Sequence, residues 1–121
     1  MKKILIVDDD SGIRELVDTT LGSDDYQIIH AKNGEGAIEI AKAEKPDLTI
    51  MDLMMPGYVD GLEATRILKG DPETRDSPII ILSGKGQEIE RKKGLEAGAD
   101  EYFTKPFSPL ALIKKVEEFL D

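Results

Sequence analysis

The chain has 121 residues, a length that fits one ordinary domain with a complete hydrophobic core. Cysteine is absent, so disulfides, thiolate metal sites and thiol nucleophiles are excluded. The formal net charge of −9, from 25 acidic and 16 basic residues, repels phosphate backbones and anionic lipids. We therefore expect no direct binding to nucleic acid and no membrane insertion.

Short apolar runs mark the predicted strands. In chain order these cover residues 4–7, 26–31, 48–51, 79–82 and 102–103. The first run is followed at once by Asp8, Asp9 and Asp10, without the small-residue cleavage site of a signal peptide. We therefore interpret it as a strand, and we expect a cytoplasmic protein.

The segments between these runs have the periodicity of helices. Their apolar residues recur at helical spacing, namely Ile13, Leu16, Val17 and Leu21, then Ala37, Ile40 and Ala41, then Leu62, Ile67 and Leu68, and finally Leu112, Ile113, Val116, Phe119 and Leu120. Asp10 or Ser11 is expected to cap the first helix, and Ser108 before Pro109 is typical of another helix start. This alternation predicts an α/β fold, with helices on both faces of a parallel sheet.

Polar side chains follow four of the predicted strands. They are Asp8, Asp9 and Asp10 after the first strand, Asp52 after the third, Ser83 after the fourth and Lys105 just beyond the fifth. In a sheet of this kind, ligands bind beyond the carboxyl ends of the strands. Carboxylates forced together repel one another unless a cation neutralises them, and an all-oxygen site with about two direct carboxylates favours Mg²⁺ over Ca²⁺. The sequence therefore predicts a magnesium site at this edge.

A lysine and a hydroxyl beside such an ion are the parts of a phosphoryl-transfer site. Asp52 stands alone after the most central run, whereas Asp8 and Asp9 are paired as metal ligands would be, so Asp52 is the candidate nucleophile. Each residue taken singly has an ordinary structural explanation, as a cap, a turn former or a surface lysine. Because these residues all lie at one edge of the predicted sheet, a functional site is favoured over the separate structural explanations. Asp9 and Asp10 are the alternative pair of ligands, but Asp8 and Asp9 are preferred because they follow Val7 immediately.

Several motifs resemble the response-regulator receiver domain of two-component signalling, the CheY-like superfamily. They are ILIVDDD, PDLTIMDLMMPG, DGLE, PIIILSG, GADEYFTKPF and the SPLAL helix start, and they span essentially the whole chain. The resemblance implies a doubly wound, flavodoxin-like (βα)5 domain over residues 1–121, with a five-stranded parallel sheet of order 2-1-3-4-5. It also implies no effector domain within that range.

The resemblance also implies a role for each site residue. Asp52 would be the phosphoacceptor and also a metal ligand, and Mg²⁺ would be bound by Asp9 directly, by Asp8 through water, and by the carbonyl of Met54. Lys105 would contact the phosphoryl group and form a cis bond with Pro106. Ser83 would be the switch hydroxyl, and Tyr102 the aromatic whose exposure changes with it.

A signalling role follows from these assignments. The phosphoryl donor would be a sensor histidine kinase or a phosphotransfer protein, and the surface around Tyr102 and the last helix would control a protein partner that the sequence does not identify. The chain would catalyse its own phosphorylation and dephosphorylation, and so would not be an enzyme in the usual sense. We expect a monomer or a weak dimer, in which lysines of the last two helices pair with Asp100 or Glu101 or face water.

Two positions depart from the family pattern. The loop after Pro56 reads GYVDG, one residue longer than the usual GMDG, and Gly84 stands where alanine is more common. The longer loop is expected to change the shape of the lid beside Asp52. The glycine is expected to leave the site more open.

The sequence also bears on three rival functions. An aspartyl-phosphate hydrolase needs an acid two residues after the nucleophile, where this chain has Met54. A dinucleotide site is suggested by Gly84 and Gly86, but the position of the third glycine is Ile89. A receiver-like interaction module that works without phosphorylation is the remaining alternative, and direct phosphorylation would discriminate it.

Overall fold

The computed structural model describes residues 1–22, 24–84 and 86–121, in which strands and helices alternate. The strands are β1 Lys2–Val7, β2 Tyr26–Ala31, β3 Leu48–Met51, β4 Ile79–Ser83 and β5 Glu101–Thr104. The helices are α1 Ser11–Leu21, α2 Gly34–Glu44, α3 Gly61–Gly70, α4 Glu88–Glu96 and α5 Pro109–Leu120.

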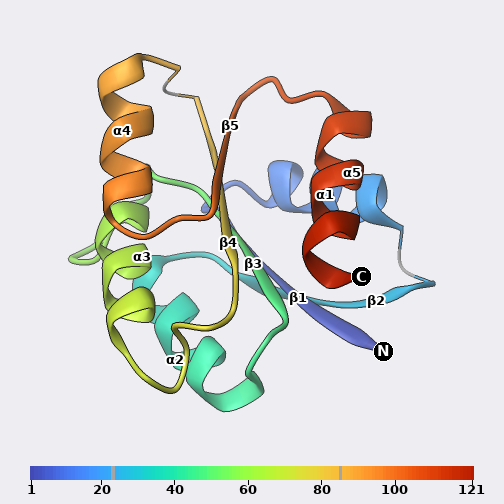
Figure 1. Cartoon of the computed structure of the whole chain (residues 1–121), viewed down its shortest axis with the longest axis horizontal. Coiled ribbons are helices and arrows are strands. Elements are labelled where there is room, and N and C mark those ends of the chain that lie inside the picture. Colours follow the sequence, from blue (N-terminus) through green and yellow to red (C-terminus); the bar gives the residue numbers. More distant parts are fainter. Residues whose placement is uncertain (23, 85) are drawn as a thin grey trace.

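The strands form one parallel sheet. Its order is β2-β1-β3-β4-β5, and β1 pairs with β2 over its whole length while β3 lies in the centre. Figure 1 shows the strands running side by side between two layers of helices. The predicted fold class and strand order are therefore confirmed.

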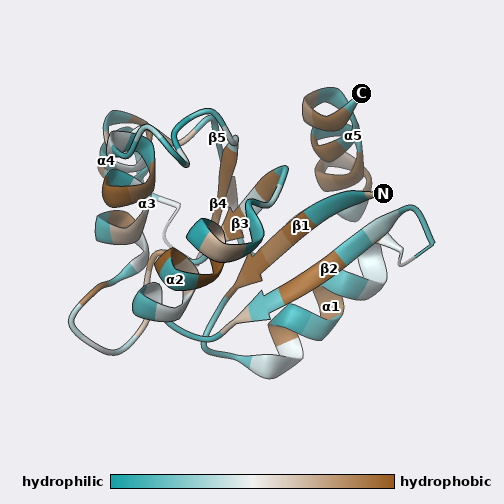
Figure 2. Ribbon diagram, turned by 90° about the horizontal axis from the view of Figure 1, so that it is seen from below, coloured by the Kyte–Doolittle hydropathy of each residue, from teal (hydrophilic) through white to brown (hydrophobic). Residues whose placement is uncertain are grey.

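The two faces of the sheet have separate hydrophobic cores. One face packs against α1 and α5, with Ile4, Val17 and Leu112 fully buried there. The other face packs against α2 and α3, where Leu5 and Ala64 are fully buried. Alternate residues of β1 point to opposite faces, so a strand that is apolar throughout serves both cores. In Figure 2 the apolar colouring accordingly covers much of the strands, while each helix shows polar and apolar residues in alternation.

The predicted strand limits agree with the structure at β2 and β3 and are one or two residues short elsewhere. Two predicted members of the apolar helical faces differ more. Leu16 is 51% exposed and Ile67 is 36% exposed, although both recur at helical spacing. The contacts of α1 explain Leu16, because Val17 and Leu21 face the core while Leu16 lines an open apolar groove with Pro106. None of the helices in the described ranges is long and apolar enough to cross a bilayer.

Asp10 is the N-cap of α1. Its carboxylate accepts hydrogen bonds from the backbone N–H of Gly12 at 2.8 Å and of Ile13 at 3.4 Å. These bonds satisfy two of the backbone donors that a helix start leaves without partners. Of the two cap residues predicted, the structure therefore selects Asp10.

Replacing this cap gives the first testable prediction. Asp10→Ala is expected to lower the free energy of unfolding by about 1 kcal/mol, because two N–H groups of α1 lose their acceptor. Urea denaturation followed by circular dichroism measures the change. Thr19→Ala on the exposed side of the same helix is the control and is expected to be neutral or slightly stabilising. Equal stability of Asp10→Ala and the wild type would contradict the capping role.

Candidate functional site

The carboxyl ends of β1 and β3 bring three carboxylates together. Asp52 continues the β3 ladder, since its N–H donates to the carbonyl of Val7 at 3.0 Å. Oxygen atoms of Asp8, Asp9 and Asp52 all lie within 4.8 Å of one another. Asp8 and Asp52 are buried, while Asp9 is exposed. Three converging oxygen donors fit a hard divalent cation such as Mg²⁺, and these are the residues that would hold it.

The register of the three N-terminal aspartates follows from this arrangement. Asp10 turns away to cap α1, and its N–H donates to Oδ1 of Asp8 at 3.0 Å. This bond helps to orient Asp8 toward the cluster. Of the two alternative pairs, the geometry therefore favours Asp8 and Asp9.

Lys105 enters the cluster from the loop after β5. Its Nζ lies 2.8 Å from Oδ2 of Asp8 and 3.4 Å from Oδ1 of Asp52. The backbone N–H of Lys105 donates to the carbonyl of Ser83 at 2.7 Å, and the Lys105–Pro106 peptide bond is cis, as predicted. Burial disfavours the ammonium ion, but the two carboxylates outweigh that effect and raise the pKa of Lys105. Lys105 is therefore a permanent cation at the site.

Asp52 has the most perturbed carboxyl group of the site. Burial, and then the negative charge of Asp8, raise its pKa to about 6, while Lys105 and the N–H of Met54 act in the opposite direction. The lysine thus compensates the local negative charge incompletely. A divalent cation would neutralise the remaining negative charge. The raised pKa of Asp52 is therefore the observation that agrees with a Mg²⁺ site.

Ser83 and Tyr102 lie behind the carboxylates on neighbouring strands. Both are buried, and the Tyr102 hydroxyl is hydrogen-bonded to the side chain of Ser83. Burial raises the pKa of Tyr102. Gly94 of α4 makes room for the ring, since a methyl group there would lie 3.1 Å from the ring of Tyr102. In this structure the tyrosine therefore points inward.

Met54 and Gly84 flank the site. The N–H of Met54 donates to the Asp52 carboxylate, and its side chain is 58% exposed. A methyl group at Gly84 would meet no described atom within 4 Å, in agreement with the predicted openness at that position.

Sequence reasoning missed two residues that shape the site. The guanidinium of Arg14 donates to the carbonyl of Asp8 from one turn into α1. Gly61, the first residue of α3, leaves no room for a side chain, because a Cβ there would clash with the carbonyl of Asp52. The motif DGLE contains this glycine, but the requirement for glycine comes from a contact with a residue nine positions earlier. That requirement appears only in the folded chain.

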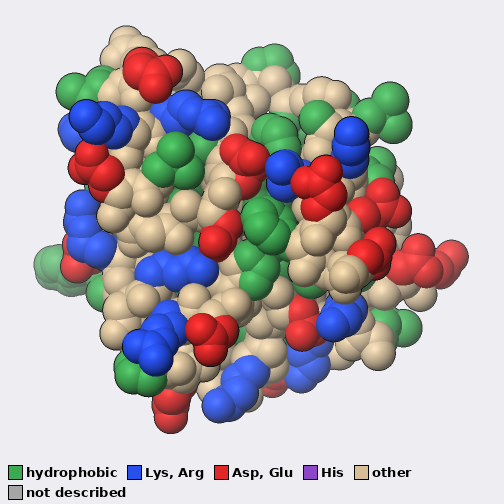
Figure 3. All heavy atoms as spheres, in the orientation of Figure 1, with side chains coloured by type: hydrophobic (Ala, Val, Ile, Leu, Met, Phe, Trp, Pro, Cys, Tyr) green, Lys and Arg blue, Asp and Glu red, His purple; other side chains and the backbone are tan. Residues whose placement is uncertain are grey.

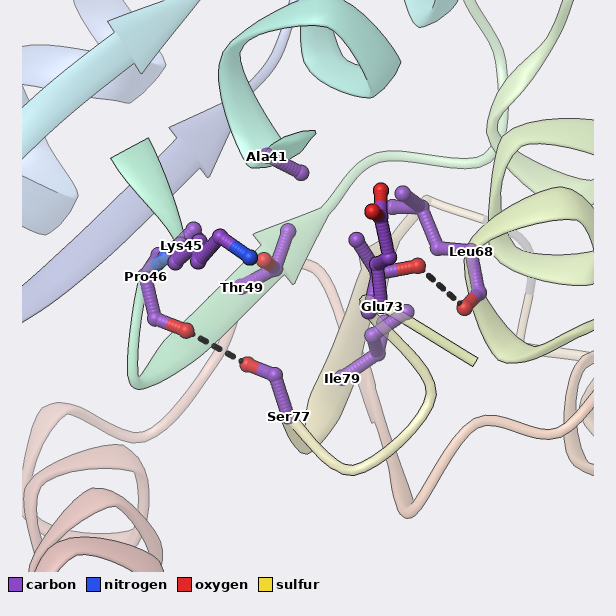
Figure 4. Close-up of a pocket in the computed structure, with 9 residues that line it drawn as sticks. Ala41, Lys45, Pro46, Thr49, Leu68, Glu73, Ser77 and Ile79 are labelled. Carbon is purple, nitrogen blue, oxygen red and sulfur yellow. Dashed lines mark hydrogen bonds between the residues drawn. The ribbon is translucent and has the colours of Figure 1, made fainter. Parts of the chain in front are cut away.

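A small pocket at the opposite edge of the sheet has no comparable chemistry. It lies near the amino ends of β3 and β4 and is lined in part by Thr49 and Ile79 (Figure 4). The hydroxyl of Ser77 donates to the carbonyl of Pro46, and that of Thr74 to the carbonyl of Leu68. Because these hydroxyls bind carbonyls of the chain itself, we assign the pocket a structural role.

Acidic residues beside β5 have ion-pair partners within the chain. Asp100 lies 2.8 Å from Nζ of Lys69, and Glu101 lies 3.4 Å from Nζ of Lys115. Arg91 is a further partner of Glu101, at 3.8 Å. On the face seen in Figure 3, acidic and basic side chains are interspersed. The pairing of Asp100 and Glu101 thus needs no second copy of the chain.

Known proteins match the chain over nearly its whole length. The family model described as the response regulator receiver domain matches residues 4–117. The phosphate regulon transcriptional regulatory protein PhoB of Pseudomonas aeruginosa is 44% identical over 119 residues, which make up 98% of this chain and 52% of that protein. The chain thus spans about half the length of the curated relatives that it matches.

Solved structures agree with this relationship. A putative response regulator from Chloroflexus aurantiacus has a TM-score of 0.92 and 34% identity, and the match covers 98% of this chain and 97% of that one. The chemotaxis protein CheY4 of Vibrio cholerae has a TM-score of 0.89 and 30% identity, with 99% of both chains covered. The chain belongs to the response regulator receiver domain family.

Proposed function

We propose that this chain is a Mg²⁺-dependent phosphorylation switch in which Asp52 accepts the phosphoryl group. The environment of Asp52 carries the proposal. Its carboxylate is buried beside Asp8 and Asp9, and the ammonium group of Lys105 lies 3.4 Å away. Family membership supports the same conclusion. A nucleophile, acidic ligands and a fixed cation are the parts that phosphoryl transfer requires.

The transfer step follows from these positions. An oxygen of Asp52 attacks the phosphorus of a phosphohistidine, the new O–P bond forms as the P–N bond breaks, and the departing imidazole nitrogen takes up a proton. Lys105, whose Nζ contacts the carboxylates of Asp8 and Asp52, would neutralise charge on the phosphoryl oxygens. Mg²⁺, when held by Asp8, Asp9, Asp52 and the carbonyl of Met54, supplies the remaining positive charge.

The response begins at Ser83. A phosphorylated Asp52 carries roughly −1.5 to −2 charge and offers new acceptor oxygens. Ser83 would turn toward them and give up its bond to Tyr102, and the ring of Tyr102 would then be released from its inward position. The two states differ in contacts with the phosphoryl group, so phosphorylation shifts their populations.

We infer the partners from the family and from the relatives. The donor would be a histidine kinase or a phosphotransfer protein in the cytoplasm. The relatives PhoB and ResD are named as transcriptional regulatory proteins and are about twice as long as this chain. The expectation of no nucleic-acid contact is therefore limited to residues 1–121. If the chain belongs to a longer protein of that plan, any contact with DNA would fall to residues outside this range.

Phosphorylation with a small donor tests the proposal. The wild type incubated with acetyl phosphate or phosphoramidate and Mg²⁺ is expected to gain the mass of one phosphoryl group, in a form that hydroxylamine removes. Omission of Mg²⁺, or Asp52→Ala, is expected to abolish the gain. Asp76→Ala, an exposed acid at the opposite edge of the sheet, is the matched control and should be phosphorylated normally.

The alternatives predict different results. Failure of the wild type to form an adduct with any donor, with Mg²⁺ still bound, would reject the phosphoacceptor and favour the phosphorylation-independent interaction module. Rapid multiple turnover of the donor without an accumulating adduct would instead favour a hydrolase.

A further inference from the structure

The loop between β3 and α3 is closed at its base and attached at its tip. At the base, the N–H of Gly61 donates to the carbonyl of Leu53 at 3.0 Å. At the tip, the N–H of Val59 donates to Oε1 of Glu35 at 2.9 Å, across 24 positions of sequence. By the resemblance to the family, this tip is the part of the loop expected to be one residue longer than the usual pattern. The extra length is thus held by a side chain from another element.

The first turn of α2 forms a seat for Val59. A methyl group at Gly34 would lie 2.9 Å from the carbonyl carbon and from Cγ1 of Val59, and closer still to its carbonyl oxygen. The backbone of Val59 therefore approaches α2 as closely as glycine allows. Its side chain packs against the core on the same face of the sheet.

Glu35 also fills the turn before Val59. Gly57 has φ +107, and the carboxylate oxygens of Glu35 lie 3.3 Å from the position that its side chain would take. The helix that carries Glu35 is fixed by its own cap, because Asn33 accepts from the N–H of Gly36 at 2.7 Å. Tyr58, at the loop tip, is fully exposed and adds no packing. The attachment of the tip therefore rests on Glu35, Gly34 and the side chain of Val59.

We propose that Glu35 is a positioning residue that holds the extended loop 53–60 in the shape that the magnesium site requires. The inference rests on the proposed function, because this loop contains the Met54 carbonyl and follows Asp52 directly. With the base closed at Gly61, movement of the tip is taken up by the few residues between Met54 and Val59. Loss of the Glu35 contact would let the loop sample shapes in which the metal ligands are no longer preorganised.

Magnesium affinity of the unphosphorylated protein, measured by isothermal titration calorimetry, tests this role. Glu35→Ala is expected to weaken Mg²⁺ binding by about 3- to 10-fold, the equivalent of one lost hydrogen bond. Glu35→Gln keeps an acceptor oxygen and is expected to bind nearly as tightly as the wild type. Glu39→Ala removes the same charge one turn later in α2 and controls for the general electrostatic effect.

Deletion of Val59 tests whether Glu35 acts through its contact with Val59 or by another route. In a chain without Val59, the loop returns to the family length and no longer needs the attachment. Glu35→Ala is therefore expected to change Mg²⁺ affinity in the wild-type background and to have no effect in the deletion background. Amide hydrogen exchange at Val59 is expected to accelerate in Glu35→Ala, which reports the contact independently of the metal.

Three outcomes would overturn the inference. Unchanged Mg²⁺ affinity in Glu35→Ala, or an equal loss in Glu35→Gln and Glu39→Ala, would reject positioning by Glu35 and leave the proposed function intact. A wild type that binds no Mg²⁺ would reject the metal centre of the proposed function as well.

Discussion

Replacement of Gly61 by alanine is expected to lower the free energy of unfolding by about 3 kcal/mol and to slow phosphorylation of Asp52. A methyl group at this position would lie 2.7 Å from the carbonyl carbon of Asp52 and from Cα of Leu53, and closer still to the carbonyl oxygen of Asp52. Those atoms belong to the backbone and have no alternative rotamer. The strain must therefore move the segment that carries Asp52. Chemical denaturation and the rate of adduct formation measure the two effects.

The same helix supplies the matched control. Gly70 ends α3, and a methyl group there would meet no described atom within 4 Å. Gly70→Ala is expected to be neutral or to stabilise by about 0.5–1 kcal/mol, because alanine loses less backbone entropy in a helix. If the two substitutions had equal effects, the close approach of Gly61 to Asp52 would not be the cause.

Asp52→Asn is expected to stabilise the metal-free protein by about 1–2 kcal/mol near neutral pH. The folded-state pKa of Asp52 is about 6, above the ordinary value of 3.8, so the folded chain binds the proton more tightly than the unfolded chain. Stability contributed by this group therefore falls as pH rises from about 4 to about 6 and is fully lost above that range. The expected stabilisation is smaller than the full pKa shift would give, because solvent screens part of the interaction.

Thermal denaturation without Mg²⁺ at about pH 8 and about pH 5 checks the sign. The difference between Asp52→Asn and the wild type is expected to be largest at the higher pH and roughly half as large at the lower pH, which lies midway through the range over which the stability is lost. Added Mg²⁺ should reverse the order at the higher pH, because the wild type binds the ion more tightly and gains stability by mass action. A substitution that destabilises the metal-free protein at the higher pH would show that the Lys105 ion pair outweighs the burial of Asp52.

The fold could be predicted because its strands and helices are marked by patterns within short stretches of sequence. Nearly continuous apolar runs identify β1, β3 and β4, and their alternation with helical periodicity leaves few topologies. The location of the site could then be predicted, because parallel strands place their carboxyl ends at one edge of the sheet. Asp8, Asp52 and Lys105 lie together there, although 97 positions separate the first from the last.

What could not be predicted depends on contacts between distant segments. Apolar spacing includes Leu16, but only its neighbours on α1 show that it faces an open groove instead of the core. The three consecutive aspartates have the same chemistry, and α1 alone decides that Asp10 is the cap. The contact of Glu35 with Val59 has no sequence signature, because a glutamate in the first turn of a helix is ordinary.

The hydrogen bond between Tyr102 and Ser83 has a consequence for the resting signal. A buried hydroxyl pair of this kind is worth about 1 kcal/mol, which favours the inward state by roughly fivefold. On the proposed mechanism, phosphorylation must first offset this preference before the outward state can predominate. On that mechanism, the bond would keep the output low in the absence of phosphorylation. Because the two hydroxyl groups are uncharged and both residues are buried, this preference for the inward state should vary little with ionic strength.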